Sequence, residues 1–158
     1  MTKKSLIRLI ISILICQLAG YLGSLFTTPS IPTWYASLQK PSFNPPNWLF
    51  SPVWITLFVL MGISLYLLLE NSFREQKLKK ALIFFAIQLV LNVLWSILFF
   101  GLKSPLFAFF EIIVLWVAIL LTIIQSFKIS KIASFLLFPY IFWVSFAAVL
   151  NYFLWNLN

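Results

Sequence analysis

The sequence contains no histidine and no aspartate, and its only carboxylate side chains are Glu70, Glu75 and Glu111. A Ser-His-Asp triad, a hydrolase with paired carboxylates and a zinc site all need side chains that are absent or too few here. The four glycines form no phosphate-binding loop pattern. The single cysteine, Cys16, cannot form an internal disulfide, and we expect it to be a small buried side chain. Any enzymatic activity would therefore involve oxidisable aromatic residues.

Charge is also scarce: charged residues make up 9% of the 158 residues, hydrophobic residues make up 63%, and the mean hydropathy is +1.05. Such values are typical of membrane proteins. A membrane-spanning helix needs about 20 mainly apolar residues, and five such segments occur, at about 5–26, 48–70, 78–101, 105–127 and 132–155. We predict an all-α integral membrane protein: a five-transmembrane-helix bundle forming one domain over residues 1–158, with a long structured loop between helices 1 and 2.

The first apolar segment follows Lys3, Lys4 and Arg8, an arrangement that a secretory signal peptide also shows. We expect a retained helix, because the apolar run is long and no cleavage site of the Ala-x-Ala type follows it. Two small-xxx-small pairs, Ala19/Gly23 and Gly20/Ser24, permit close helix contact, either within the bundle or across a dimer.

The formal charge of +8 is distributed unevenly over the predicted loops. With the N-terminus in the cytoplasm, nine cations lie on the cytoplasmic side, namely Lys3, Lys4, Arg8, Arg74, Lys77, Lys79, Lys80, Lys128 and Lys131. Only Lys40 and Lys103 lie on the other side. The positive-inside rule therefore predicts a cytoplasmic N-terminus and a C-terminus outside. We expect the stretch 74–80 to contact anionic lipid headgroups, and we expect no nucleic acid partner.

The long connection runs from Thr27 to about Asn47, on the outer side in this topology. Residues 31–38 are predicted to form a short interfacial helix that holds Trp34 and Tyr35 at headgroup depth. Prolines at positions 41, 45 and 46 fix backbone dihedrals, so the loop is stiff. A stiff loop at this place is consistent with a cap held in one position.

Polar and aromatic residues recur at helical spacing within three spans. The stripes consist of Gln88, Asn92 and Trp95 in the third span, Tyr140, Trp143, Ala147 and Asn151 with Phe146 beside them in the fifth, and Trp54, Phe58 and Met61 in the second. Two interpretations remain open: the stripes fill the bundle core and join helices, or they line a ligand pocket. Pro139, expected to kink the fifth span, and the small pair Ala147-Ala148 favour the pocket.

Glu111 is the sole acid well inside a span. Such a residue is a functional candidate by default, because a charge is costly in hydrocarbon. The interpretation we favour is structural: a hydrogen bond from Glu111 to an amide or hydroxyl of a neighbouring helix.

Four motifs, in order along nearly the whole chain, closely resemble the tryptophan-rich sensory protein or translocator protein family (TspO/MBR). They are "WY..L.KPS..PP" in the first loop, "PVW" in the second span, "Q..LN..WS..FF" in the third and "PY..W..FA..LN" in the fifth. The resemblance implies a bacterial cell membrane location, a homodimer, and a pocket opening toward the first loop. It also implies binding of porphyrins such as protoporphyrin IX and haem, or of other flat apolar molecules, and, in some members, light- and oxygen-dependent porphyrin degradation.

The resemblance also implies which residues would bind the ligand here. They are Tyr35 and Pro45 as the roof, Trp54 and Phe58 from helix two, Asn92 and Trp95 from helix three, and Trp143, Phe146 and Ala147 from helix five. Trp54 and Trp143 match the tryptophans implied in porphyrin breakdown. We expect no required cofactor and no metal ligand, because haem would lack an axial histidine.

Some positions depart from the family pattern. Phe43 stands where tryptophan is frequent, and Ser51 stands where glycine is common before "PVW". The cholesterol motif expected near the end of helix five fails, since "FLWNLN" contains no basic residue, so a cholesterol partner has no support.

Three functions follow as hypotheses. The first is a receptor or sensor that binds porphyrin-like ligands, and the second is a porphyrin-degrading enzyme using Trp54 and Trp143. The third and weakest is a tetrapyrrole transporter, because five helices with short loops show no inverted repeat and no charged pathway.

Overall fold

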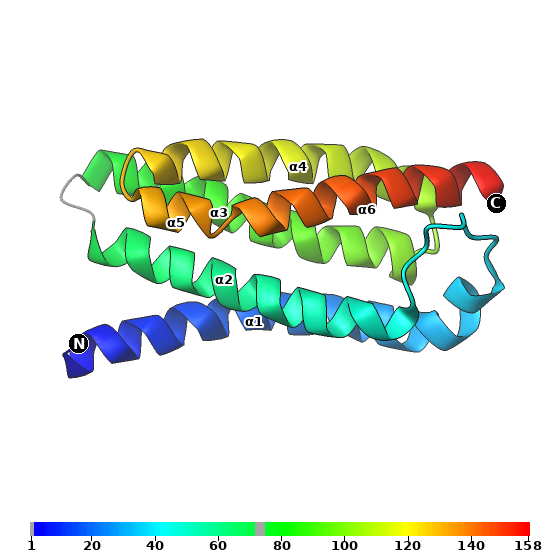
Figure 1. Cartoon of the computed structure of the whole chain (residues 1–158), viewed down its shortest axis with the longest axis horizontal. Helices are drawn as coiled ribbons and strands as arrows, with labels where there is room; N and C mark the ends of the chain where they lie inside the picture. The colour runs from blue at the N-terminus through cyan, green and yellow to red at the C-terminus, as the bar shows by residue number, and fades with distance from the viewer. Residues whose placement is uncertain (1, 72–74) are drawn as a thin grey trace.

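Five long helices run side by side along the longest axis of the molecule (Figure 1). The computed structural model describes residues 2–71 and 75–158, so the predicted lipid contact of Arg74 lies outside the described part. The long helices are α1 (Lys3–Ser30), α2 (Phe50–Glu70), α3 (Glu75–Ser96), α4 (Pro105–Phe127) and α6 (Phe138–Leu157). Shorter elements are η1 (Ile31–Tyr35), η2 (Asn47–Leu49), η3 (Ile97–Gly101) and α5 (Lys131–Phe135).

Within the described residues, five helical segments are long and apolar enough to cross a membrane. They confirm the predicted all-helical bundle with five spans. The bounds of α4 coincide with the predicted span 105–127, and those of α2 differ from the predicted span 48–70 only in its first residues. Every backbone amide of such a bundle is bonded within its own helix, which is why helices are stable in hydrocarbon.

The first span is longer than the predicted 5–26. Helix α1 continues through Pro29 to Ser30, and the chain remains helical to Tyr35 as the π-helical η1, with Pro32 in its first turn. A proline lacks the backbone N–H that would donate within a helix. The helix can still continue when the surrounding backbone hydrogen bonds change from the α spacing to the longer π spacing. The helix predicted over residues 31–38 is present over residues 31–37, but it continues α1 without a break, and the irregular loop contains only residues 38–46.

The fifth span is interrupted, as the predicted kink at Pro139 requires. Helix α5 ends at Phe135, and α6 begins at Phe138 with Pro139 in its first turn, where no intrahelical donor is needed. The break turns the α6 residues that follow toward α3 and the cavity described below.

Two ends of the bundle differ in composition. The basic end holds the N-terminus, the end of α2, the start of α3 and the connection that precedes α5, with Lys3, Lys4, Arg8, Lys77, Lys79, Lys80, Lys128 and Lys131 (Figure 1). The loop end holds residues 38–46 and the C-terminus (Figure 1). At the basic end α1 and α2 are joined by an ion pair of 2.9 Å between Arg8 and Glu70 and by a 2.6 Å hydrogen bond between the Ser5 and Tyr66 hydroxyls.

Glycines allow α1 to lie directly against its neighbours. A Cβ added to Gly62 of α2 would lie 2.5 Å from the Cα of Ile13, and one added to Gly23 would lie 3.0 Å from the Ser96 hydroxyl oxygen of α3. Ala19 and Gly23 are buried. The small residues of α1 thus serve contacts inside the bundle.

We predict that Gly62→Ala destabilises the protein, because the new methyl group meets the backbone of Ile13, which cannot rotate away. Overpacking of this kind costs about 1–3 kcal/mol, of which the better helix propensity of alanine recovers up to about 1 kcal/mol. Thermal unfolding in detergent measures the effect. The control is Gly101→Ala, whose Cβ meets only the Phe26 ring edge at 3.0 Å. Equal stability of the two variants would contradict the prediction.

Candidate functional site

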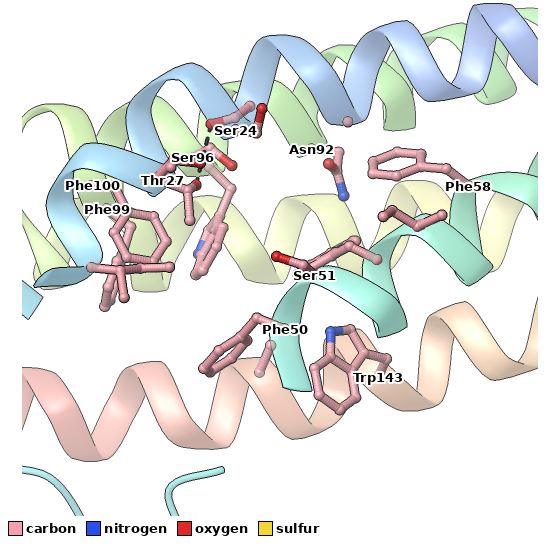
Figure 2. Close-up of a pocket in the computed structure, with 18 of the residues that line it drawn as sticks. Ser24, Thr27, Phe50, Ser51, Phe58, Asn92, Ser96, Phe99, Phe100 and Trp143 are labelled. Carbon is pink, nitrogen blue, oxygen red and sulfur yellow. Dashed lines mark hydrogen bonds between the residues drawn. The ribbon is translucent and has the colours of Figure 1, made fainter. Parts of the chain in front are cut away.

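A cavity of about 430 Å³ lies in the loop-end half of the bundle, enclosed by α1, α2, α3, η3 and α6 (Figure 2). Eight of the nine residues implied as ligand contacts line it: Tyr35, Trp54, Phe58, Asn92, Trp95, Trp143, Phe146 and Ala147. They come from four separate elements, so only the tertiary fold brings them together. Their contact with a ligand stays a prediction.

Pro45 is the exception. It is buried but does not line the cavity. It lies outside the lining because the helical part of the chain extends to Tyr35, so that η1 rather than the proline-rich loop reaches the cavity. A contact of Pro45 with a ligand stays a prediction. Phe50, the first residue of α2, also lines the cavity and makes an edge contact with Tyr35 at 6.3 Å between ring centroids.

Aromatic rings form the walls. Trp54 stacks on Phe58 with centroids 5.7 Å apart, and Trp95 stacks on Phe99 at 5.1 Å. From α6, Trp143 lies 6.4 Å from Phe50 across the cavity margin (Figure 2). Rings held by such contacts keep fixed orientations, so the cavity offers flat apolar faces to a guest.

Hydrogen bonds between helices hold the polar residues of the site. Asn92 donates from Nδ2 to the Tyr140 hydroxyl at 3.0 Å, joining α3 to α6. The Trp95 indole N–H donates to Asn151 Oδ1 at 3.1 Å, and Asn151 Nδ2 donates to the carbonyl oxygen of Pro105 at 2.7 Å. The second arrangement connects α3, α6 and α4. Trp95 thereby uses its only donor and presents its ring to the cavity.

The loop end of the cavity is closed. Tyr35 is only 2% exposed, and its hydroxyl donates to Asn44 Oδ1 at 2.7 Å. The loop is also tied to the C-terminus, because the Asn158 side chain accepts from the Gln39 amide at 2.9 Å and donates to its carbonyl at 3.0 Å. Phe43 packs with its ring centroid 5.3 Å from that of Phe153. The long loop is thus structured, as predicted, and Tyr35 of η1 rather than the loop itself covers the cavity.

Sequence reasoning missed the contribution of α1 to the site. The missed residues are Gln17, Gly20, Tyr21, Gly23, Ser24, Thr27 and Thr28, with Ile31 of η1. A signal existed: Gln17, Tyr21, Ser24 and Thr28 follow one another at helical spacing in an otherwise apolar segment. Phe99 and Phe100 of η3 were missed as well, because a π-helical turn changes which residues face inward.

Gln88 and Glu111, two polar residues that the sequence analysis singled out, are buried outside the cavity lining. Gln88 is 1% exposed, as its predicted inward position requires, and its Nε2 donates to the Met61 sulfur at 3.8 Å. Glu111 is 8% exposed, and neither carboxyl oxygen has a hydrogen-bond partner within residues 2–71 and 75–158. The predicted bond from Glu111 to a neighbouring amide or hydroxyl is thus not formed among the described residues.

The sequence resembles known proteins along nearly its whole length. The sequence model of the TspO/MBR family covers residues 12–156. The chain is 48% identical to the Tryptophan-rich protein TspO of Archaeoglobus fulgidus, over 98% of this chain and 99% of that protein. It is 43% identical to the Tryptophan-rich protein TspO of Chlorobaculum tepidum, over 99% of both. It is 36% identical to the Translocator protein of Homo sapiens, over 90% of this chain and 85% of that protein. The chain therefore belongs to the TspO/MBR family of multi-pass integral membrane proteins.

Proposed function

We propose that this protein is a membrane receptor or sensor that binds a porphyrin, such as protoporphyrin IX or haem, or a similar flat apolar molecule. The observation that carries the proposal is the cavity itself, whose walls are the faces of Trp54, Trp95 and Trp143. A cavity of about 430 Å³ is within the range of sites for small organic ligands, about 300–1,000 Å³. Offset stacking of a planar ring system on indoles supplies affinity beyond area burial, about 0.5–1.5 kcal/mol for each aromatic pair.

The polar chemistry of the lining fits the same class of ligand. None of the described residues that line the cavity is acidic or basic, and its polar members carry amides and hydroxyls. A porphyrin macrocycle is apolar and planar, while its two carboxylates extend from one edge. An uncharged cavity suits the macrocycle, and the hydroxyls of Ser51 and Thr28 in its lining can donate hydrogen bonds to the carboxylates.

The lining also bears on the choice between haem and metal-free porphyrin. Axial haem ligands in proteins are histidine, cysteine, methionine or tyrosine side chains. The chain has no histidine, and Cys16 and Met61 are in the bundle core outside the lining. Of these ligand types only tyrosine occurs in the lining, as Tyr21 and Tyr35, and the Tyr35 hydroxyl already donates to Asn44. Metal-free porphyrin therefore suits the site at least as well as haem, and no metal is required for binding.

A second candidate function is photo-oxidative degradation of protoporphyrin by light and oxygen. It is favoured by the position of Trp54 and Trp143 in the lining and by the edge contact of Trp54 with Tyr140 at 6.3 Å. Indole and phenol rings are the oxidisable groups of a chain that lacks acid-base residues at this site. Tetrapyrrole transport remains the weakest alternative.

The cellular setting is part of the proposal. We place the basic end in the cytoplasm of a bacterial cell and the loop end outside, because eight described cations gather at the basic end. Anionic lipid headgroups would contact these cations. We further propose that the chain forms a homodimer through its lipid-facing helix surfaces.

The first test of the receptor function is a binding titration. We predict that Trp143→Ala weakens protoporphyrin IX binding by about 2 kcal/mol, about thirtyfold in Kd, because it removes an aromatic wall. Porphyrin absorbance measures binding to purified protein in the dark. Trp48→Ala is the matched control, since Trp48 is 71% exposed and outside the lining. Absence of saturable binding to the wild type would refute the receptor function.

The second test separates binding from chemistry. Protoporphyrin IX is illuminated in air with wild type, Trp54→Phe, Trp143→Phe and the control Trp48→Phe. If the protein is an enzyme, the first two variants form product severalfold more slowly at saturating porphyrin, because phenylalanine is harder to oxidise than tryptophan. Product formation equal to that of free porphyrin in detergent would reject the enzymatic function and leave the receptor.

The third test concerns the metal. We predict that haem bound to this protein gives no spectrum of strong axial ligation, and that metal-free protoporphyrin competes with it at equal or lower concentration. Absorption spectra during a competition titration record both properties. A six-coordinate low-spin haem spectrum would show that a side chain reaches the iron and would contradict the prediction.

A further inference from the structure

We propose that the flat apolar ligand enters the cavity sideways from the bilayer, through an opening between α1 and α2 near the loop end. The proposal rests on the proposed receptor function and adds the access route, which decides what form of ligand the protein receives. We call this gap the side opening; its margins are Tyr21, Ser24 and Thr28 on α1 and Ser51 and Ile55 on α2.

The side opening is identified by residues that line the cavity and are exposed at the same time. Tyr21 is 62% exposed and Ile55 is 56% exposed, yet both line the cavity. Each belongs to a helix long and apolar enough to span the membrane, so their exposed surfaces face lipid. The interior of the cavity is therefore continuous with the hydrocarbon region.

The loop end offers no comparable path. Tyr35 covers the cavity there and is 2% exposed, with its hydroxyl bonded to Asn44. Access from that side would break this bond and separate the Gln39 backbone from Asn158, which the structure joins by two hydrogen bonds. The side opening needs no such rupture.

The side opening is closed toward the basic end. Gln17 on α1 donates from Nε2 to the carbonyl oxygen of Ile55 on α2 at 3.0 Å and so connects the two helices. Closer to the basic end, Gly62 lies directly against Ile13, and no gap for a ligand remains there. The two helices are thus in direct contact at Gly62 and joined at Gln17, and the cavity lies on the loop side of these contacts.

The margin chemistry suits an amphipathic planar molecule. The Ser24 hydroxyl donates to the Tyr21 carbonyl at 2.7 Å, so it is satisfied within its own helix and remains tolerable beside lipid. Its oxygen, with those of Thr28 and Ser51, can still accept a hydrogen bond from a passing carboxyl group. Figure 2 shows Ser24 on α1 and Ser51 on α2 on different sides of the space.

The test blocks the side opening with a bulky adduct. Ile55→Cys is labelled with an aromatic maleimide, and the protein is reconstituted into phosphatidylcholine nanodiscs. Tryptophan quenching by protoporphyrin IX then gives the association and dissociation rates. We expect the adduct to slow association by about tenfold or more. Wild type treated with the same reagent controls for labelling of Cys16, which is 0% exposed.

Two further variants make the result specific. An adduct on Val90→Cys, at a 67% exposed site on α3 outside the lining, should leave the association rate unchanged. Asn158→Ala, which releases the loop from the C-terminus, should leave it unchanged as well.

The opposite outcomes overturn the proposal in distinguishable ways. The side opening would be rejected if the Ile55→Cys adduct left the association rate unchanged, or if it weakened affinity only through faster dissociation. The receptor function would stand in either case. Faster association in Asn158→Ala would show that ligand enters at the loop end. No saturable quenching of the wild type would refute the receptor function, and the access route with it.

Discussion

The contact of Gly62 with the backbone of Ile13 sets the geometry on which the rest of the structure depends. Where no side chain intervenes, two helices approach until their backbones touch, and α1 is held against α2 over its basic half. Beyond that contact the larger Trp54 and Phe58 rings of α2 require more room, and their faces become a cavity wall. The cavity therefore ends where α1 and α2 pack closely, and it is walled by aromatic rings on the loop side of that contact.

Hydrogen bonds inside hydrocarbon give the site its rigidity. An unpaired polar group is costly in hydrocarbon, and the Asn92 amide and the Trp95 indole each donate to a side chain of a facing helix. The same bonds connect α3 to α6 and, through Asn151, to α4. These bonds hold the aromatic rings in an uncharged, preformed site. Such a site suits a receptor for planar apolar molecules.

Hydropathy predicted the five spans, and helical spacing indicated the inward stripes of the second, third and fifth spans. The family resemblance implied nine ligand contacts, of which eight line the cavity. Local patterns failed where the helix changed type. The long connection was predicted to begin at Thr27, but α1 and the π-helical η1 continue through Pro29 and Pro32 and place Tyr35 at the cavity. The polar residues of α1 were overlooked because the sequence shows their helical spacing but does not show which helices they face.

The amino-acid sequence by itself determined that the chain spans a membrane five times and that its stripes of tryptophan and amide residues turn inward, since burial in lipid leaves few alternatives for such residues. Only the tertiary structure decided which stripes share one cavity and where that cavity opens. Those properties depend on interhelical distances, which are set by the size of side chains at each crossing: Gly62 against Ile13 at one point, and large rings at another.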